Sequence, residues 1–172
     1  MPPHCDTLDG PVVRAARCAI ETNNVNLVLP YVPKEGEEEV VRVFEQVLKA
    51  RTASAASREV ADRYFFETVV RVHRAGEGAP FTGLKPAGVD VGPVIPVAET
   101  AIETGSPREL IDLLSAVVHE EIDRRLHEVI HLRPHASATV DEARAWVHAM
   151  LGLQVWAHGL YAAARAEPHA AA

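Results

Sequence analysis

The stretch SREVADRYFFETVVRVHRAG, residues 57–76, decides the fold class. Its apolar residues recur every three to four positions, which is the period of an α-helix with one buried face. The helix is expected to begin near Ser57 and to stop at Gly76, because glycine commonly ends helices. No stretch of the chain alternates polar and apolar residues with β-branched enrichment over the length of a strand. The sequence therefore predicts an all-α protein.

The same helical signals recur in the N-terminal part of the chain. Residues 36–51, GEEEVVRVFEQVLKAR, begin with acidic and end with basic residues, as the helix dipole favours. Asp9 is expected to cap an earlier helix that has Pro11 in its first turn and ends near Asn23. The stripe expected to be buried on that helix consists of Val12, Val13, Ala16, Ala19 and Ile20.

Two further long helices follow in the C-terminal part of the chain, after a short one. Each begins with a capping box, in which a small polar side chain and a later glutamate satisfy free backbone amides. The first box, at the start of residues 106–134, consists of Ser106, Pro107 and Glu109, and the second consists of Thr139 and Glu142.

Residues 76–93 interrupt the helices with five glycines and three prolines, a composition that no regular element tolerates. Long ordered loops of this kind are often functional. We therefore expect a single helical domain over residues 1–172, a bundle of about four long helices with one long Gly/Pro-rich loop. Residues 1–8 are expected to form an N-terminal metal-binding arm, and residues 168–172 a frayed tail.

Charge and hydropathy exclude some partners. The net charge of −7 disfavours nucleic acid, whose binding needs clustered Lys and Arg. The chain has no basic start followed by an apolar run, and no apolar stretch long enough to span a bilayer. We therefore expect a cytoplasmic protein with no membrane partner, and homo-oligomerisation stays open.

The first residues, MPPHCDTLDG, place three metal-binding side chains next to each other. The imidazole of His4, the thiolate of Cys5 and the carboxylate of Asp6 are all competent ligands, and a thiolate beside an imidazole favours copper, nickel, zinc or iron over hard ions. The alternative is a free thiol beside chance neighbours. An exposed cysteine without a role is an oxidation liability, which favours the metal interpretation.

The stretch HCDTLDG, residues 4–10, resembles the N-terminal nickel hook of nickel superoxide dismutase, which reads His-Cys-Asp-Leu-Pro-Cys-Gly. In that family the first histidine, the cysteine after it and the second cysteine bind nickel. The resemblance therefore implies that His4 and Cys5 are catalytic metal ligands, with Asp6 in register. Asp9 occupies the place of the second thiolate and offers oxygen instead of sulfur. Residues 1–3 would have to be removed to free the His4 amine.

The chain as a whole resembles a largely uncharacterised bacterial family. Three signatures carry this resemblance: HCDTLDGPVV at residues 4–13, ADRYFFET at 61–68 and HRAGEGAPFTGLKPAG at 73–88. Some members of that family carry a secretion signal that is cut just before the histidine, so the resemblance implies that some related chains are secreted. The resemblance implies no activity.

Three further side chains could complete a metal site. His73 shares a helix face with Phe66 and Val69 and is expected to point inward, with Glu67 nearby on the same helix. His158 lies among apolar residues of the last helix and is also expected to be buried. A lone histidine on an apolar face is more often a hydrogen-bonded core residue than a ligand, and this alternative stays open for both histidines.

Taken together, these features predict a metal-binding helical bundle. The expected ion is a transition metal, with nickel or copper favoured over zinc or iron. The most specific hypothesis is one-electron chemistry on superoxide or another small oxygen species, which would be the small-molecule substrate. The alternatives are a non-catalytic metal-sequestering protein and a helical scaffold that holds no metal. The expected ligands are His4, Cys5, Asp6, Asp9, Glu67, His73 and His158.

Overall fold

A computed structural model describes residues 4–166. The chain divides into two compact units, Met1–Gly92 and Pro93–Ala172. Their described parts, residues 4–92 and 93–166, are called here the N-terminal unit and the C-terminal unit. The expected all-α helical architecture is confirmed in these residues, which contain one isolated β-bridge and no strand. That the whole chain is a single domain stays a prediction. The expected frayed tail, residues 168–172, lies outside the described residues, as do residues 1–3.

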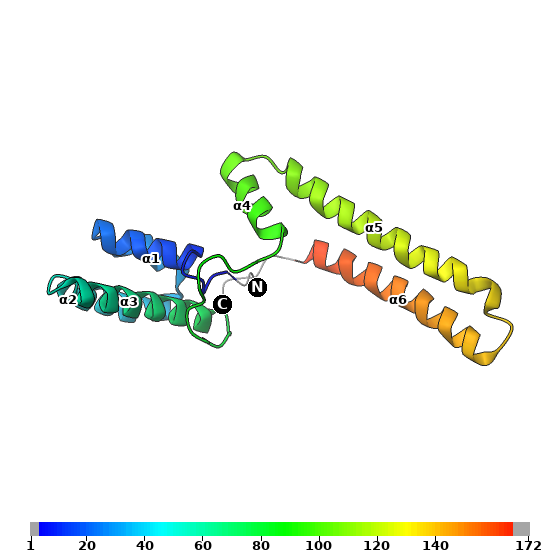
Figure 1. The fold of residues 1–172 in the computed structure, drawn as a ribbon, viewed down its shortest axis with the longest axis horizontal. Helices are drawn as coiled ribbons and strands as arrows, with labels where there is room; N and C mark the ends of the chain where they lie inside the picture. The colour runs from blue at the N-terminus through cyan, green and yellow to red at the C-terminus, as the bar shows by residue number, and fades with distance from the viewer. Residues whose placement is uncertain (1–3, 167–172) are drawn as a thin grey trace. The chain divides into compact units, whose positions relative to one another are not determined.

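Three α-helices build the N-terminal unit (Figure 1). Helices α1 and α2 both pack against α3. Between α1 and α2 the chain makes three short 3-10 turns, which the prolines of this segment favour over a longer helix. The bounds are α1 Pro11–Thr22, η1 Val25–Leu27, η2 Leu29–Tyr31, η3 Lys34–Gly36, α2 Glu37–Ala50 and α3 Ala55–Gly76.

The core of the N-terminal unit lies where these three helices meet. Phe65 of α3 is fully buried, and its ring centroid lies 5.6 Å from that of Phe44 on α2. Glycine permits close packing at the edge of this core, since a Cβ on Gly36 would lie 2.2 Å from a methyl carbon of Val72. The stripe predicted for α1 is buried in full: Val12, Val13, Ala16, Ala19 and Ile20.

Two details of the N-terminal helices differ from the predictions. The residue that caps α1 is Gly10 and not Asp9, because the Asp9 carboxylate accepts a hydrogen bond from the Gly88 amide in the loop instead. Helix α3 begins at Ala55, two residues before the expected Ser57, because the Ser54 hydroxyl accepts a hydrogen bond from the Ser57 amide and caps the helix.

The C-terminal unit contains α4 Val94–Thr104, α5 Arg108–Leu132, η4 Arg133–His135 and α6 Val140–Arg165. Helices α5 and α6 form an antiparallel hairpin, and α4 packs against α5 (Figure 1). None of residues 93–166 is fully buried. No helix of residues 4–166 combines the length and the apolar character needed to cross a membrane.

The predicted capping box at Thr139 forms in part. The Thr139 hydroxyl accepts from the Glu142 amide, as predicted, whereas the Glu142 carboxylate accepts from the Thr139 hydroxyl in place of a backbone amide. The box predicted from Ser106, Pro107 and Glu109 is wrong, because Pro107 takes the capping position and offers no side-chain acceptor.

Candidate functional site

The N-terminal segment that carries His4 and Cys5 lies against the Gly/Pro-rich loop. The Leu8 amide donates to the Lys85 carbonyl at 3.0 Å, and the Lys85 amide donates to the Asp6 carbonyl at 2.8 Å. These two bonds form the isolated parallel bridge between Thr7 and Lys85. The loop therefore holds the segment in place through main-chain hydrogen bonds.

A tight turn shapes the segment itself. The buried Thr7 hydroxyl donates to the His4 carbonyl at 2.9 Å, and the Gly10 amide donates to the Thr7 carbonyl at 3.0 Å. A Cβ on Gly10 would lie only 1.8 Å from the His4 carbonyl oxygen. Residue 10 must therefore be glycine for the chain to turn from the His4–Cys5 segment into α1.

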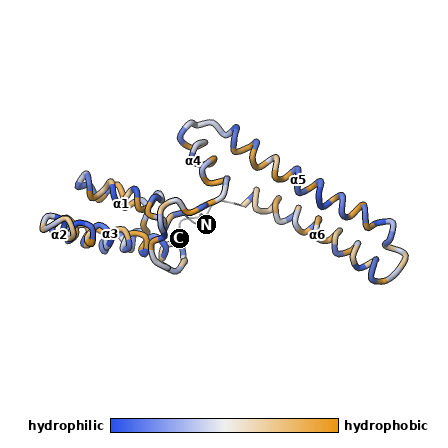
Figure 2. The backbone as a smooth tube through the Cα atoms, in the orientation of Figure 1, coloured by the Kyte–Doolittle hydropathy of each residue, from blue (hydrophilic) through white to orange (hydrophobic). Residues whose placement is uncertain are grey.

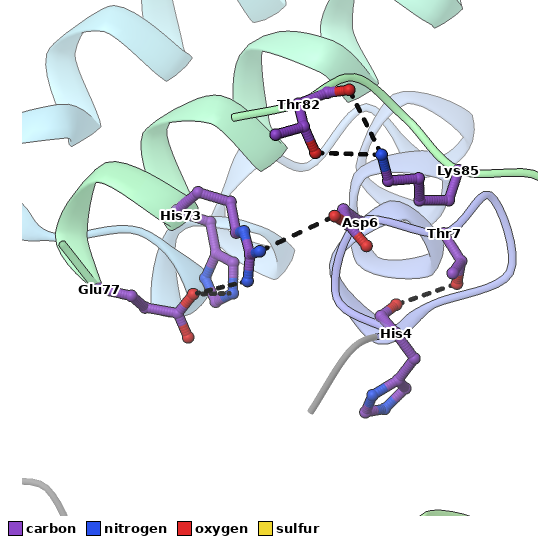
Figure 3. Close-up of polar contacts among 8 residues, drawn as sticks. His4, Asp6, Thr7, His73, Glu77, Thr82 and Lys85 are labelled. Carbon is purple, nitrogen blue, oxygen red and sulfur yellow. Dashed lines mark hydrogen bonds and ion pairs between the residues drawn. The ribbon is translucent and has the colours of Figure 1, made fainter. Parts of the chain in front are cut away.

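His73 and Glu77 lie at the C-terminal end of α3, beside this segment (Figure 3). The His73 Nδ1 lies 2.7 Å from the Tyr31 carbonyl oxygen, and since a carbonyl only accepts, Nδ1 carries the proton. The other ring nitrogen, Nε2, is buried without a hydrogen bond and lies 3.3 Å from a Glu77 carboxylate oxygen. Only 14% of the His73 side chain is exposed, as its predicted inward orientation requires.

The Cys5 thiol is half-buried beside the same group of side chains. Burial raises the pKa of the Cys5 thiol, and the carboxylates of Glu77 and Asp6 raise it further, whereas the Arg74 guanidinium lowers it. The two opposing influences of Glu77 and Arg74 show that Cys5 lies within electrostatic reach of the end of α3. The thiol is therefore held in its protonated form.

Two of the predicted oxygen ligands have structural partners. The buried Asp6 carboxylate lies 3.9 Å from the Arg74 guanidinium, which also lies 3.9 Å from Glu77. The Asp9 carboxylate accepts a hydrogen bond from the Gly88 amide at 2.8 Å, and this bond is the main cause that holds the pKa of Asp9 below its usual value. Both carboxylates fix the N-terminal segment to its neighbours.

The remaining predicted ligands lie elsewhere. Glu67 is about two and a half turns before the end of α3 and pairs with Arg63 at 3.1 Å. His158 belongs to α6 of the C-terminal unit and is exposed, so the prediction that it is buried is wrong. Within residues 93–166 no further helix covers that face of α6, so apolar neighbours in the sequence do not bury the ring.

Glu77 is the functional candidate that the sequence reasoning missed. It lies four residues after His73, a spacing that places both side chains on one helix face. This four-residue spacing could have identified Glu77, but the helix was expected to stop at Gly76, which places Glu77 in the loop. Within residues 4–166, no three His, Cys, Asp or Glu side chains already converge closely enough to hold a metal ion.

A groove of about 600 Å³ lies between α2 and α3, at the opposite end of α3 from His73. Its wall contains no His, Cys, Asp or Glu, so it offers no ligand and no acid or base of that kind. The lining residues are Gln46, Val47, Ala50, Ala56, Ser57, Val60, Ala61 and Tyr64.

Comparison with known families matches residues 9–156 to a family described as a family of unknown function, DUF6448. The chain belongs to DUF6448. The expected membership of an uncharacterised family is thereby confirmed. The matched range includes His73 and Glu77 and begins after Cys5. No curated protein and no solved structure matches the chain.

Proposed function

We propose that this DUF6448 protein binds a transition metal ion through the Cys5 thiolate, the His73 Nε2 and the Glu77 carboxylate, with His4 as a further ligand. The state of His73 carries the proposal. Metal-binding histidines typically donate one ring N–H to a carbonyl and turn the other nitrogen to the metal, and His73 has its Nδ1 on the Tyr31 carbonyl and a buried Nε2 without a hydrogen bond.

The charges around Cys5 support the same proposal. Burial and two carboxylates raise the pKa of the Cys5 thiol despite the nearby Arg74 guanidinium, so the thiol is neutral when no metal ion is bound. A divalent ion would reverse this balance, because it stabilises the thiolate and offsets the carboxylate charges. Binding should therefore release a proton from Cys5, as is general for thiolate ligands.

The proposed ligand set revises the one expected from sequence. Glu77 replaces Glu67, and Asp6 and Asp9 position the N-terminal segment instead of binding the ion, because their carboxylates face Arg74 and the Gly88 amide. Since the proposed ligands do not converge in the described residues, binding requires the Cys5 and His4 side chains to turn toward the end of α3.

The chemistry of the bound ion is a second step of the proposal. The likeness of residues 4–10 to a nickel hook favours nickel or copper and one-electron chemistry on superoxide. Asp9 stands where the hook has its second thiolate, and its hydrogen bond to Gly88 gives it another role. Non-catalytic sequestration of the same ion is therefore the alternative, and it needs only the ligands.

Elemental analysis of the untagged protein, together with its intact mass, tests this proposal. We expect about one nickel, copper, zinc or iron ion per chain. Cys5→Ser and His73→Asn should each lose the ion, and the asparagine keeps an N–H donor for the Tyr31 carbonyl. Turnover of superoxide by the loaded protein would distinguish an enzyme from a sequestering protein.

Matched controls come from the same chain. Cys18→Ser removes the exposed second thiol, and His127→Ala with His131→Ala removes an exposed histidine pair on α5. Both controls should keep the ion. A wild-type protein without metal, whose melting temperature is indifferent to added ions, would overturn the proposal and favour the scaffold interpretation.

A further inference from the structure

Helix α5 ends in a row of three histidines. His127 and His131 lie about one turn apart on the helix, and His135 follows after four more residues, in the 3-10 turn η4. Residues 127–131 read His-Glu-Val-Ile-His, and the pattern His-Glu-x-x-His on a helix places two imidazoles on one face, where they bind zinc. Residues 127–131 are helical throughout, as this pattern requires. The end of α5 is therefore a second candidate metal site.

The rings of successive histidines in this row are neighbours. The ring centroids of His127 and His131 lie 6.4 Å apart, with 25° between the ring planes, and those of His131 and His135 lie 6.5 Å apart. Two imidazoles on one tetrahedral zinc ion have centroids about 5 Å apart, because zinc–nitrogen bonds are about 2.0–2.1 Å long. No three ligands already converge in residues 4–166, so binding requires the rings to approach by about 1 Å, which rotation of exposed side chains allows.

All three imidazoles are accessible to an ion from solvent, because their residues are exposed. The contact side of α5 is marked by Arg125, whose guanidinium carbon lies 4.7 Å from the ring centroid of Trp156 on α6. His127 follows Arg125 by two residues, or about 200° around the helix, and therefore faces away from α6. Figure 2 shows hydrophilic residues recurring along α5 between apolar ones, as a helix with one face in contact requires.

The charges around the row do not oppose a cation. Residues 119–135 contain four carboxylates and three arginines. Two of these arginines, Arg124 and Arg125, pair with Glu121 at 2.9 Å and 3.0 Å, which offsets part of their charge. His131 lies in the last turn of α5, where the helix dipole attracts positive charge.

We propose that His127, His131 and His135 bind a divalent transition metal ion of the zinc, nickel and copper class, with water completing its coordination. Imidazole nitrogen suits these ions, whereas calcium and magnesium prefer oxygen ligands. His131 is the central ligand, because its ring is the neighbour of both other rings. The bound ion links the last turn of α5 to η4.

This site is independent of the ion proposed at Cys5 and His73. It has no thiolate and its ligands are exposed, so its ion exchanges with solvent and the site is filled by added metal. The ion in the N-terminal unit is the one expected to remain bound during purification. Removal of His127 and His131 therefore leaves that ion in place.

Calorimetric titration of the full chain with zinc tests the proposal, in a Cys5→Ser, Cys18→Ser background that has no thiol. We expect one zinc ion per chain. His131→Ala should raise the dissociation constant about 100-fold or more, because it leaves two ligands two turns apart and removes the gain from linking them. His127→Ala and His135→Ala each leave one neighbouring pair and should raise it less, by about 10-fold.

His119→Ala is the matched control, at an exposed position of α5 about two turns before His127, and should leave the dissociation constant unchanged. A thiol-free chain that binds no zinc, or an unchanged affinity in His131→Ala, would overturn the proposal. Equal weakening by His119→Ala would overturn it too, because it indicates unspecific binding to surface histidines.

Two further arms keep the test decisive. If the thiol-free background loses helicity, the same variants are titrated in the wild-type chain, where His131→Ala should remove one zinc ion per chain at matched concentrations. If the N-terminal unit binds no metal, the wild-type and thiol-free chains bind the same single zinc ion. The two proposals can therefore fail separately.

Discussion

The two units of the chain are built from similar helices but bury their apolar side chains very differently. The N-terminal unit has seventeen buried apolar residues, fifteen of them on its three α-helices, and residues 93–166 have none. The C-terminal unit also has three helices, with α4 and α6 both packed against α5, yet none of its residues is buried. An amphipathic stripe therefore becomes a core only where the surrounding helices close over its full width. The core of the N-terminal unit positions the candidate metal site, whereas the hairpin of the C-terminal unit leaves many apolar side chains exposed.

The largest expected effect is the loss of a core ring in the N-terminal unit. Phe65→Ala should cost about 3–5 kcal/mol of unfolding free energy, because it leaves a cavity against Phe44. Leu126→Ala, at a 43% exposed position on α5, should cost less than about 1 kcal/mol in dilute protein. Chemical denaturation followed by circular dichroism measures both, and equal losses would erase the contrast between the units.

Replacing a glycine with alanine should change stability in opposite directions in the two units. Gly10→Ala should cost about 1–3 kcal/mol, because its Cβ would collide with the His4 carbonyl. Gly152→Ala should instead add about 0.5–1 kcal/mol, because nothing lies near that position and alanine favours a helix. Thermal unfolding of both variants gives the signs. A neutral Gly10→Ala would show that the N-terminal turn is not closed as described.

A smaller effect is expected in the reactivity of Cys5. Its raised pKa keeps little thiolate at neutral pH, so alkylation should be slow and should accelerate as the pH rises. In a Cys18→Ser background, Glu77→Gln should lower the Cys5 pKa and speed alkylation a few-fold at neutral pH. Glu67→Gln, on the same helix, is the control and should leave the rate unchanged. A rate independent of Glu77 would remove that carboxylate from the surroundings of Cys5.

The smallest effect is expected in the stability of the protein at acidic pH, through Asp9. The pKa of Asp9 is lowered in the folded chain, so its contribution to stability is present above the usual value of 3.8 and is lost as the pH falls through the folded value. Asp9→Asn should remove this part of the pH dependence. Urea midpoints measured over a series of acidic buffers provide the test, with Asp90→Asn as the control. Parallel curves for wild type and Asp9→Asn would contradict the assignment.

Local pattern predicted much of the fold. The stripe from Val12 to Ile20 is buried as expected because a 3.6-residue period needs only a neighbouring helix to pack on. The cap at Thr139 formed because its partner, Glu142, is local. Asp9 failed as a cap because the Gly88 amide, distant in sequence, competes for its carboxylate.

The candidate site was less accessible to sequence reasoning. His4, Cys5 and His73 were selected by residue type, but the carbonyl of Tyr31 that fixes the His73 tautomer comes from an unrelated turn. Glu77 was missed because Gly76 suggested that the helix face ended there. His158 failed because its exposure depends on what covers the hairpin, and the periodicity of one helix carries no information about that.

Hydrogen exchange of the full chain, read amide by amide, tests the contrast in burial between the two units. Amides of α1, α2 and α3 should be strongly protected, because their buried core is complete within one chain. Amides of α5 and α6 should exchange faster, because none of residues 93–166 is buried. Equal protection of the helices in the two units would contradict this contrast.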